Sequence, residues 1–170
     1  MTLKTNILRF ISISVLGVLL HFTYEWSGQN PAVALFSAVN ESTWEHLKLL
    51  FFPMLLLTFI ELTLIRGKLP DNYLQARTLG ILSGMAFIII TFYTLWGVLG
   101  KMLEFVNIAI YFLGVIFSLL CENKLYNSHI KISRFTSACI LAILTGAFFA
   151  FTRQAPDIGL FFDLAKHPVL

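Results

Sequence analysis

The most informative shortage in this chain is a shortage of charge. Only 12% of its 170 residues are Asp, Glu, Lys or Arg, whereas 58% are hydrophobic. Soluble domains usually carry about a quarter charged residues, so this chain has too little polar surface for a soluble globule. The composition excludes a soluble protein and predicts an integral membrane protein.

Several other features are missing, and each absence excludes a class of protein. There are two cysteines and neither a Cys-x-x-Cys nor a His-Glu-x-x-His motif, so the common zinc-site spacings do not occur. No Pro/Gly/Ser-rich linker, low-complexity tract or internal repeat divides the sequence, and we expect one integral membrane domain over residues 1–170. The net charge of +3 comes without a basic and aromatic stripe, which argues against nucleic-acid binding.

Apolar runs long enough to cross a bilayer occur five times. A hydrocarbon core of about 30 Å requires roughly 20 residues of helix, and the runs cover 7–24, 44–65, 76–98, 102–121 and 134–152, with a tail at 153–170. Two basic residues, Lys4 and Arg9, lie at the start of the first run, but no small-x-small cleavage site comes after it, so we interpret it as an uncleaved signal-anchor. The predicted fold class is therefore all-α, a polytopic bundle of five transmembrane helices.

The distribution of basic residues predicts the orientation of this bundle. Eight Lys and Arg residues fall on the side of the N-terminus and four on the other side. By the positive-inside rule, the N-terminus is inside and the C-terminus is outside. The three tryptophans then fall at the outer ends of spans, where their rings favour the interface. Cys121 and Cys139 fall on the inner side, which argues for free thiols rather than a disulfide.

Small residues recur at four-residue spacing in the last three spans. Helices in lipid approach one another closely where such residues line the interface. We interpret these stripes as contact faces within one bundle rather than as a homodimer interface. The stripes are Gly80 and Gly84, Gly114 and Ser118, and Ala138, Ala142, Gly146 and Ala150.

The densest polar cluster, residues 40–48, leads directly into the second span. Ser42 and Glu45 have the spacing of a capping box, which predicts a helix N-terminus. Within a helix, Glu41 and Glu45 lie one turn apart, and Ser42 and His46 lie one turn apart on the adjacent stripe. Two acids, an imidazole and a hydroxyl are therefore expected on one face.

The first span carries a polar stripe that we expect to meet this cluster. Ser14, Gly17, His21 and Glu25 follow helical spacing, and such a stripe should face protein rather than lipid. Consecutive spans are antiparallel, so the end of the first span and the start of the second meet at the outer face of the membrane. The candidate site is therefore an outward-facing group of His21, Glu25, Glu41, Glu45 and His46.

Three interpretations of this group remain open. In the first, all five residues supply imidazole and carboxylate ligands to a divalent metal such as zinc. In the second, the pocket is metal-free and performs acid–base catalysis, with the catalytic group His21, Glu25, Glu45 and His46. In the third, the charges are solvated helix ends, and Glu45 pairs only with Lys48. Ser42 as a nucleophile with His46 as its base is the weakest idea, since a cap already explains Ser42.

The tail adds polar groups on the same expected side. Apolar residues lie between its two aspartates, a pattern that resembles a short interfacial helix able to cover the outer site. We therefore treat four residues as candidate substrate-binding or lid residues, namely Arg153, Asp157, Asp163 and His167.

The motifs around the polar cluster resemble those of a known group of sequences. The run His-Phe-x-Tyr-Glu-Trp-Ser-Gly-x-Asn-Pro at 21–31, followed by Val-Asn-Glu-Ser-x-Trp-Glu-His-Leu-Lys at 39–48, is similar to a family of small bacterial multi-pass membrane proteins catalogued as a domain of unknown function. The resemblance implies a membrane protein and no activity, and we expect the protein in the bacterial cytoplasmic membrane.

The residues predict that the protein is a membrane enzyme that is either metal-dependent or acid–base in mechanism. Its expected partners are the lipid bilayer and a small-molecule or lipid substrate. The alternative is a non-enzymatic binding or transport-accessory protein without a catalytic site. An alternating-access transporter is less favoured, because the sequence shows neither repeated halves nor a pair of broken spans.

Overall fold

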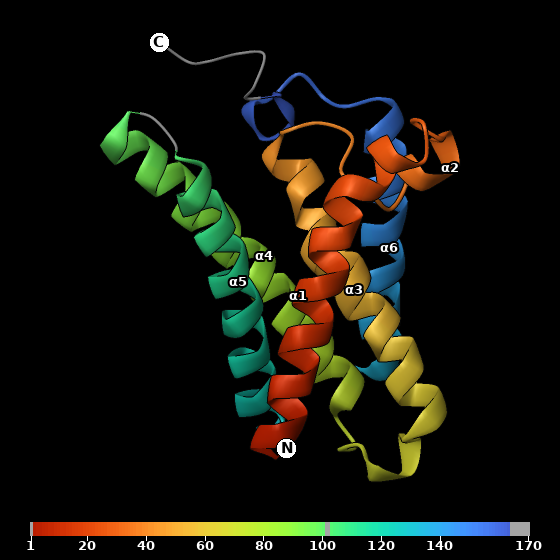
Figure 1. Ribbon diagram of the computed structural model, residues 1–170. Helices are drawn as coiled ribbons and strands as arrows, with labels where there is room; N and C mark the ends of the chain where they lie inside the picture. The colour runs from red at the N-terminus through yellow and green to blue at the C-terminus, as the bar shows by residue number, and fades with distance from the viewer. Residues whose placement is uncertain (1, 101–102, 164–170) are drawn as a thin grey trace.

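All regular elements of the computed structural model, which describes residues 2–100 and 103–163, are helices (Figure 1). Within these ranges, five helices are long and apolar enough to cross a membrane, which confirms the predicted five-span, all-α class. They are α1 (Leu3–Trp26), α3 (Thr43–Leu64), α4 (Tyr73–Leu99), α5 (Glu104–Leu125) and α6 (Arg134–Arg153). Three short elements lie in the connections, namely α2 (Pro31–Ala34), η1 (Arg66–Lys68) and η2 (Gly159–Phe161).

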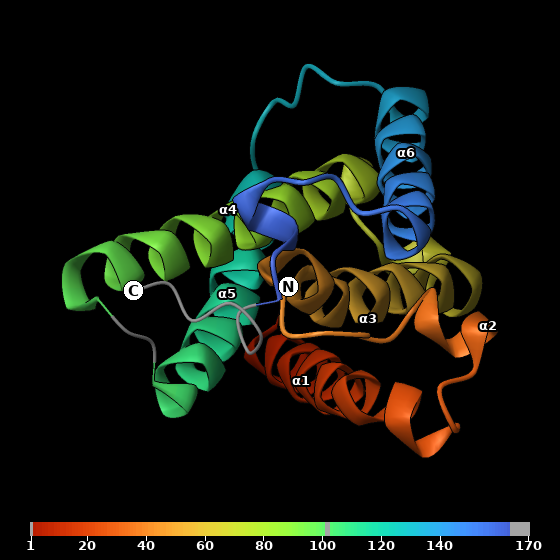
Figure 2. The same ribbon diagram turned by 90° about the horizontal axis from the view of Figure 1, so that it is seen from above.

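Helix α3 occupies the centre of the bundle. About 56% of its membrane-spanning window is buried, against 17–28% for the other four spans. Figure 2 shows α3 with α1 on one side and α4 and α6 on the others, while α5 packs against α4 and α1. Side chains that line this core come from all five spans, and the outer faces of the other helices expose large apolar side chains to the surroundings.

The two ends of the bundle differ in how closely the helices pack. We call the end where α1 ends and α3 begins the α2 end, and the opposite end, where α3 ends and α4 begins, the η1 end. At the α2 end, α4 and α5 diverge from α1 and α3 (Figures 1 and 2). At the η1 end, four of the spans are held together by buried charges.

These buried charges form a closed ring in which arginines and glutamates alternate. Arg9 of α1 binds Glu61 of α3 through Nε at 2.6 Å and Nη2 at 2.7 Å, and its Nη1 lies 3.1 Å from Glu122 of α5. Arg77 of α4 lies 2.8 Å from Glu61 and 3.1 Å from Glu122. All four side chains are at most 8% exposed. We call Arg9, Glu61, Arg77 and Glu122 the charge ring.

Two tyrosines add hydrogen bonds to the charge ring. Tyr73 donates to Glu61 at 2.5 Å, and Tyr126 is hydrogen-bonded to Glu122 and lies 3.2 Å from Arg9 Nη1. Each carboxylate is thus shared by two arginines and one tyrosine, so the ring carries no net charge. A buried ion is tolerated only when it is paired and hydrogen-bonded in this way.

Glycines allow α4 and α5 to approach each other. A Cβ atom at Gly84 would lie 2.8 Å from Ser118 Cβ and 3.0 Å from Gly114 O, and Ser118 donates a hydrogen bond of 2.8 Å to Gly80 O. The small-residue stripes of these two spans therefore form a contact face within the bundle, as predicted. The corresponding interpretation is wrong for α6, because its small residues are exposed, namely Ala138, Ala142, Gly146 and Ala150.

Gly17 is the tightest point of the contact between α1, α3 and α5. A Cβ atom there would lie 2.5 Å from Leu49 O and would collide with the Tyr111 hydroxyl, which donates to Leu49 O and Ile13 O. We expect Gly17→Ala to lower the free energy of unfolding by about 1–3 kcal/mol, because a backbone atom cannot move aside as a side chain can. Gly146→Ala is the matched control, since nothing lies within 4 Å of its Cβ position. Thermal unfolding in detergent measures both, and equal effects would contradict the expected collision.

Candidate metal site

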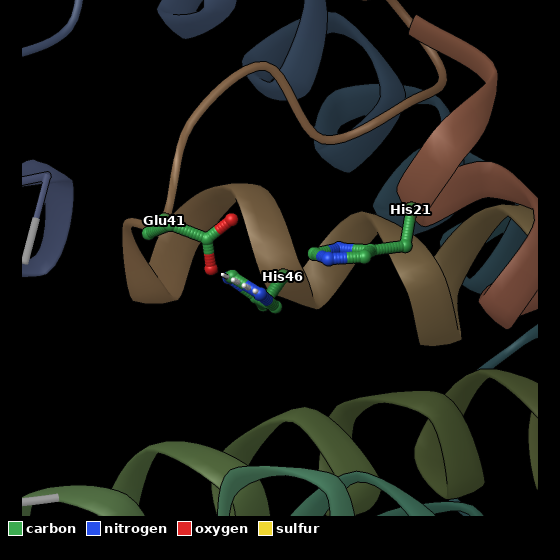
Figure 3. A group of neighbouring side chains, drawn as sticks. All are labelled: His21, Glu41 and His46. Carbon is green, nitrogen blue, oxygen red and sulfur yellow. Dashed lines mark ion pairs between the residues drawn. The ribbon is translucent and has the colours of Figure 1, made fainter. Parts of the chain in front are cut away.

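Three polar side chains converge at the α2 end (Figure 3). His21 comes from the penultimate turn of α1, His46 from the first turn of α3, and Glu41 from the connection just before α3. One ligand atom from each residue lies within 4.8 Å of the other two. The structure therefore brings together three of the five residues that the sequence predicts to form a site.

Helix α3 determines how His46 is presented. Ser42 is the N-cap of α3, and its hydroxyl accepts a hydrogen bond from the Glu45 N–H, as the capping-box spacing predicts. One turn later, His46 Nδ1 lies 2.9 Å from the carbonyl oxygen of Ser42. A carbonyl only accepts, so Nδ1 carries the hydrogen. The Ser42 hydroxyl is buried and used as a cap, and this arrangement gives no support to a Ser42–His46 nucleophile pair.

The other nitrogen of His46 points at a carboxylate. His46 Nε2 lies 3.3 Å from Glu41 Oε2. If His46 is neutral with its hydrogen on Nδ1, Nε2 carries only a lone pair. Nε2 and the Glu41 oxygen are then both hydrogen-bond acceptors, and they repel each other unless a cation lies between them. The cation is either a proton on Nε2 or a metal ion. Charge-assisted hydrogen bonds are usually about 2.7–2.9 Å long, whereas two ligands of a tetrahedral zinc ion are separated by about 3.4 Å.

His21 lies beside this pair and brings a second imidazole to the group. Its ring lies 5.3 Å from the His46 ring, centroid to centroid, and 4.9 Å from the edge-on ring of Phe22. His21 Nδ1 is buried and has no hydrogen-bond partner among the described residues. Buried polar atoms in proteins are nearly always satisfied, so this nitrogen is free to bind a group from outside the chain.

Glu41 keeps the group accessible and negatively charged. Its side chain is 52% exposed and that of His46 is 32% exposed, so a ligand can reach the site without opening the bundle. The nearby His46 imidazole, as hydrogen-bond partner and as charge, holds the pKa of the Glu41 carboxyl below its usual range. The carboxylate is therefore ionised at neutral pH and available to bind a cation.

The other two predicted residues lie outside this group. Glu25 is exposed, and its carboxylate faces the Gln29 side-chain amide at 3.4 Å. Glu45 is buried, accepts a hydrogen bond of 3.0 Å from the Val39 N–H and pairs with Lys48 at 2.6 Å. The solvated-end interpretation correctly pairs Glu45 with Lys48, but it is wrong about the surroundings, because the pair is buried and Glu45 also binds the Val39 N–H.

Lys48 is a structural residue whose role the sequence did not reveal. It is fully buried, and its ammonium group binds three other oxygens besides Glu45. These partners are the carbonyl oxygens of Ala34 and Ser37, at 2.9 and 3.2 Å, and the Thr152 hydroxyl of α6, at 2.6 Å. Lys48 thus holds the connection between α1 and α3, which carries Glu41, against α3 and α6.

The described part of the tail, residues 153–163, packs on Trp44 in the first turn of α3. In η2, Phe161 packs on Trp44 at 5.0 Å and on Phe151 at 5.3 Å, centroid to centroid. Arg153 and Asp157 are exposed, Asp163 is half-buried, and His167 lies outside the described residues. None of these four residues belongs to the three-residue group drawn in Figure 3, and their role as a lid stays a prediction.

Comparison with known proteins places the chain in a family. The model of a family of unknown function, DUF6512, matches residues 2–167, which is nearly the whole chain. The chain belongs to this family. Curated proteins and solved structures give no match. DUF6512 membership agrees with the resemblance seen in the sequence motifs, and any function for the chain has to be argued from the site.

Proposed function

We propose that the protein is a metal-dependent membrane enzyme of the bacterial cytoplasmic membrane, with a divalent ion such as zinc bound by His21, Glu41 and His46. The observation that supports this most is the convergence of one ligand atom each from His21, Glu41 and His46 within 4.8 Å of one another, with His46 Nε2 and Glu41 Oε2 3.3 Å apart. Two imidazoles and one carboxylate are the ligand set of several catalytic zinc sites. The Ser42 carbonyl orients His46 as outer partners orient metal-binding histidines elsewhere.

The number of ligands supports a catalytic rather than a structural ion. Three protein ligands leave one tetrahedral position for water or substrate, whereas structural zinc sites are closed by four. An ion in this site would lower the pKa of a bound water to about 7 and polarise a substrate oxygen. The partial exposure of Glu41 and His46 gives a substrate access to that position.

The orientation of the site is also part of the proposal. The excess of Lys and Arg toward the η1 end favours an inner η1 end and an outer α2 end. The metal site would then lie at the outer membrane surface. A substrate would approach it from outside the cytoplasm or from the outer leaflet.

The ligand assignment predicts a specific pattern of zinc binding. The protein purified in detergent should bind about one zinc ion per chain. His21→Ala should raise the zinc Kd by at least about 100-fold, since loss of even an outer partner costs 10- to 100-fold. Isothermal titration calorimetry and elemental analysis measure both quantities, and a thermal unfolding scan shows whether each variant is folded.

Two control variants make this test specific. Glu25→Gln changes the acid one turn from His21, and His129→Ala removes an exposed histidine at the η1 end. Both should bind zinc like the unmodified chain, and a loss of binding in Glu25→Gln would contradict the three-residue assignment. In sealed right-side-out vesicles, a membrane-impermeant chelator should remove the zinc, and failure to do so would contradict the outer location.

A metal-free acid–base pair is the second candidate, because 3.3 Å also permits a proton between Glu41 and His46. The two candidates give different results in the same titration. If zinc, manganese and cobalt do not bind, the acid–base function is retained and the metal-dependent function is abandoned.

A further inference from the structure

A second candidate site lies at the η1 end, away from the histidines. A pocket of about 650 Å³ opens between the end of α3, the η1 connection and the first turns of α4 and α6. Its walls are largely apolar, and the polar side chains around it are few. The lining residues are Leu62, Gly67, Leu69, Pro70, Asp71, Tyr73, Leu74 and Arg134. Pockets of about 300–1,000 Å³ with apolar walls and a few polar groups are typical of small-ligand sites.

Arg134 places a fixed positive charge at this pocket. Its Nε and Nη2 donate to the backbone carbonyl of Asp71, at 3.2 and 2.7 Å. The Asp71 carboxylate lies 4.0 Å from Nη2 and is fully exposed, so it neutralises the guanidinium only weakly. The backbone contact holds the guanidinium in place and leaves its charge available to an anion.

The surface around the pocket has the same sign of charge. The acids of the charge ring are buried and already paired, so they contribute no negative potential at this end. Among the described residues at the η1 end, one acid is exposed, Asp71, whereas five bases are exposed, namely Lys4, Lys68, Lys124, Lys131 and Arg134. Anionic lipid surfaces attract basic groups of this kind at the ends of membrane helices.

We propose that this pocket binds one anionic phospholipid from the leaflet that meets the η1 end. Its phosphate would pair with the Arg134 guanidinium, whose planar fork matches phosphate oxygens. An acyl chain would lie against the apolar wall formed by Leu62, Leu69 and Leu74. These apolar walls favour a lipid over free phosphate, which would leave them without a partner.

The charge ring gives this pocket a rigid wall. Tyr73 lines the pocket and donates its hydroxyl to Glu61 at 2.5 Å, so its ring cannot swing away without breaking that bond. Arg77 lies over the Tyr73 ring at 5.3 Å from its centroid. The pocket is thus formed in advance on at least this side, which reduces the ordering that binding requires.

Native mass spectrometry tests the lipid site. The full chain would be extracted from nanodiscs that contain equal amounts of phosphatidylglycerol and phosphatidylcholine with identical acyl chains. We expect one retained phosphatidylglycerol per chain, preferred over phosphatidylcholine. Arg134→Gln should lower its retention about tenfold or more, as expected for loss of a charge-assisted contact. Leu69→Trp, which fills the pocket from a half-buried position, should lower retention of any lipid.

The controls separate a built site from diffuse charge and from free phosphate. Lys124→Gln removes another exposed base at the same end that is not among the residues lining the pocket, and it should retain lipid like the unmodified chain. Inorganic phosphate in large excess over the lipid should not displace it, because phosphate cannot use the apolar walls. Equal losses in Arg134→Gln and Lys124→Gln, equal retention of the two lipids, or displacement by phosphate would each overturn the proposal.

Discussion

Glu122→Ala is expected to destabilise the bundle by about 3–5 kcal/mol, the usual cost of removing one partner from a buried ion pair. Glu122 is fully buried and binds both Arg9 and Arg77. Without it, two guanidinium groups share the single carboxylate of Glu61, and one positive charge stays uncompensated inside the bundle. Thermal unfolding in detergent measures the loss.

A double variant tests whether charge balance is the cause. Arg77→Met combined with Glu122→Met removes one charge of each sign and leaves Arg9 bound to Glu61 through two hydrogen bonds of 2.6 and 2.7 Å. We expect this double variant to be more stable than either single variant, since apolar replacement of a whole buried pair is often neutral. Glu104→Ala, in the exposed first turn of the same helix, should change stability by less than about 0.5 kcal/mol. Additive losses in the double variant would show that packing, not charge, dominates.

Lys48→Met is expected to release the connection that carries Glu41. The substitution removes the donor for two backbone carbonyls and the Thr152 hydroxyl, and it leaves the 3%-exposed carboxylate of Glu45 without its counter-charge. We expect a loss of about 3–5 kcal/mol. Hydrogen exchange should accelerate at the Val39 amide, whose acceptor is Glu45, and zinc affinity should fall because Glu41 is no longer held near His46.

Two further variants show whether the buried charge explains this effect. Lys48→Met with Glu45→Gln keeps an oxygen acceptor for the Val39 amide without a buried charge, and it should recover part of the stability. Lys124→Met removes an exposed lysine and should leave both exchange and zinc binding unchanged. Unaltered protection at Val39 in Lys48→Met would contradict the structural role of this lysine.

The number and type of helices were predictable because their signals are local. Five apolar runs of sufficient length, the Ser42 cap and the glycines of α4 and α5 are all properties of neighbouring residues, and each reappears in the structure. The small residues of α6 gave the same local signal, yet they are exposed. A stripe of small residues shows that another helix could pack closely against that face. Whether a helix does so depends on where the other helices of the bundle lie.

The site was predictable only in part because its geometry depends on where α3 begins. With Ser42 as the cap, Glu41 lies outside the helix, so the one-turn spacing of Glu41 and Glu45 does not hold. Glu45 and His46 are consecutive and point about 100° apart around α3. His46 therefore faces His21, while Glu45 faces the connection before α3 and Lys48.

The charge ring was largely missed because its pairs are distant in the sequence. Arg77 and Glu61, 2.8 Å apart, are separated by only 16 residues, and theirs is the shortest sequence separation among the ion pairs of the ring. Arg9 appeared to be an N-terminal flanking charge, and Glu122 followed the predicted end of the fourth span. Partners separated by 52 and 113 residues meet only through tertiary packing, which no periodic pattern in one sequence reports.

The order of charges in the ring also bears on how the chain enters the membrane during synthesis. The first span brings a positive charge, and α3 neutralises it with Glu61; α4 then brings a second positive charge, and α5 neutralises that one with Glu122. Since an unpaired charge in lipid is costly, insertion is favoured in two helical hairpins, α1 with α3 and α4 with α5. The last span, α6, contributes no charge to the ring and can join a core that is already electrically neutral.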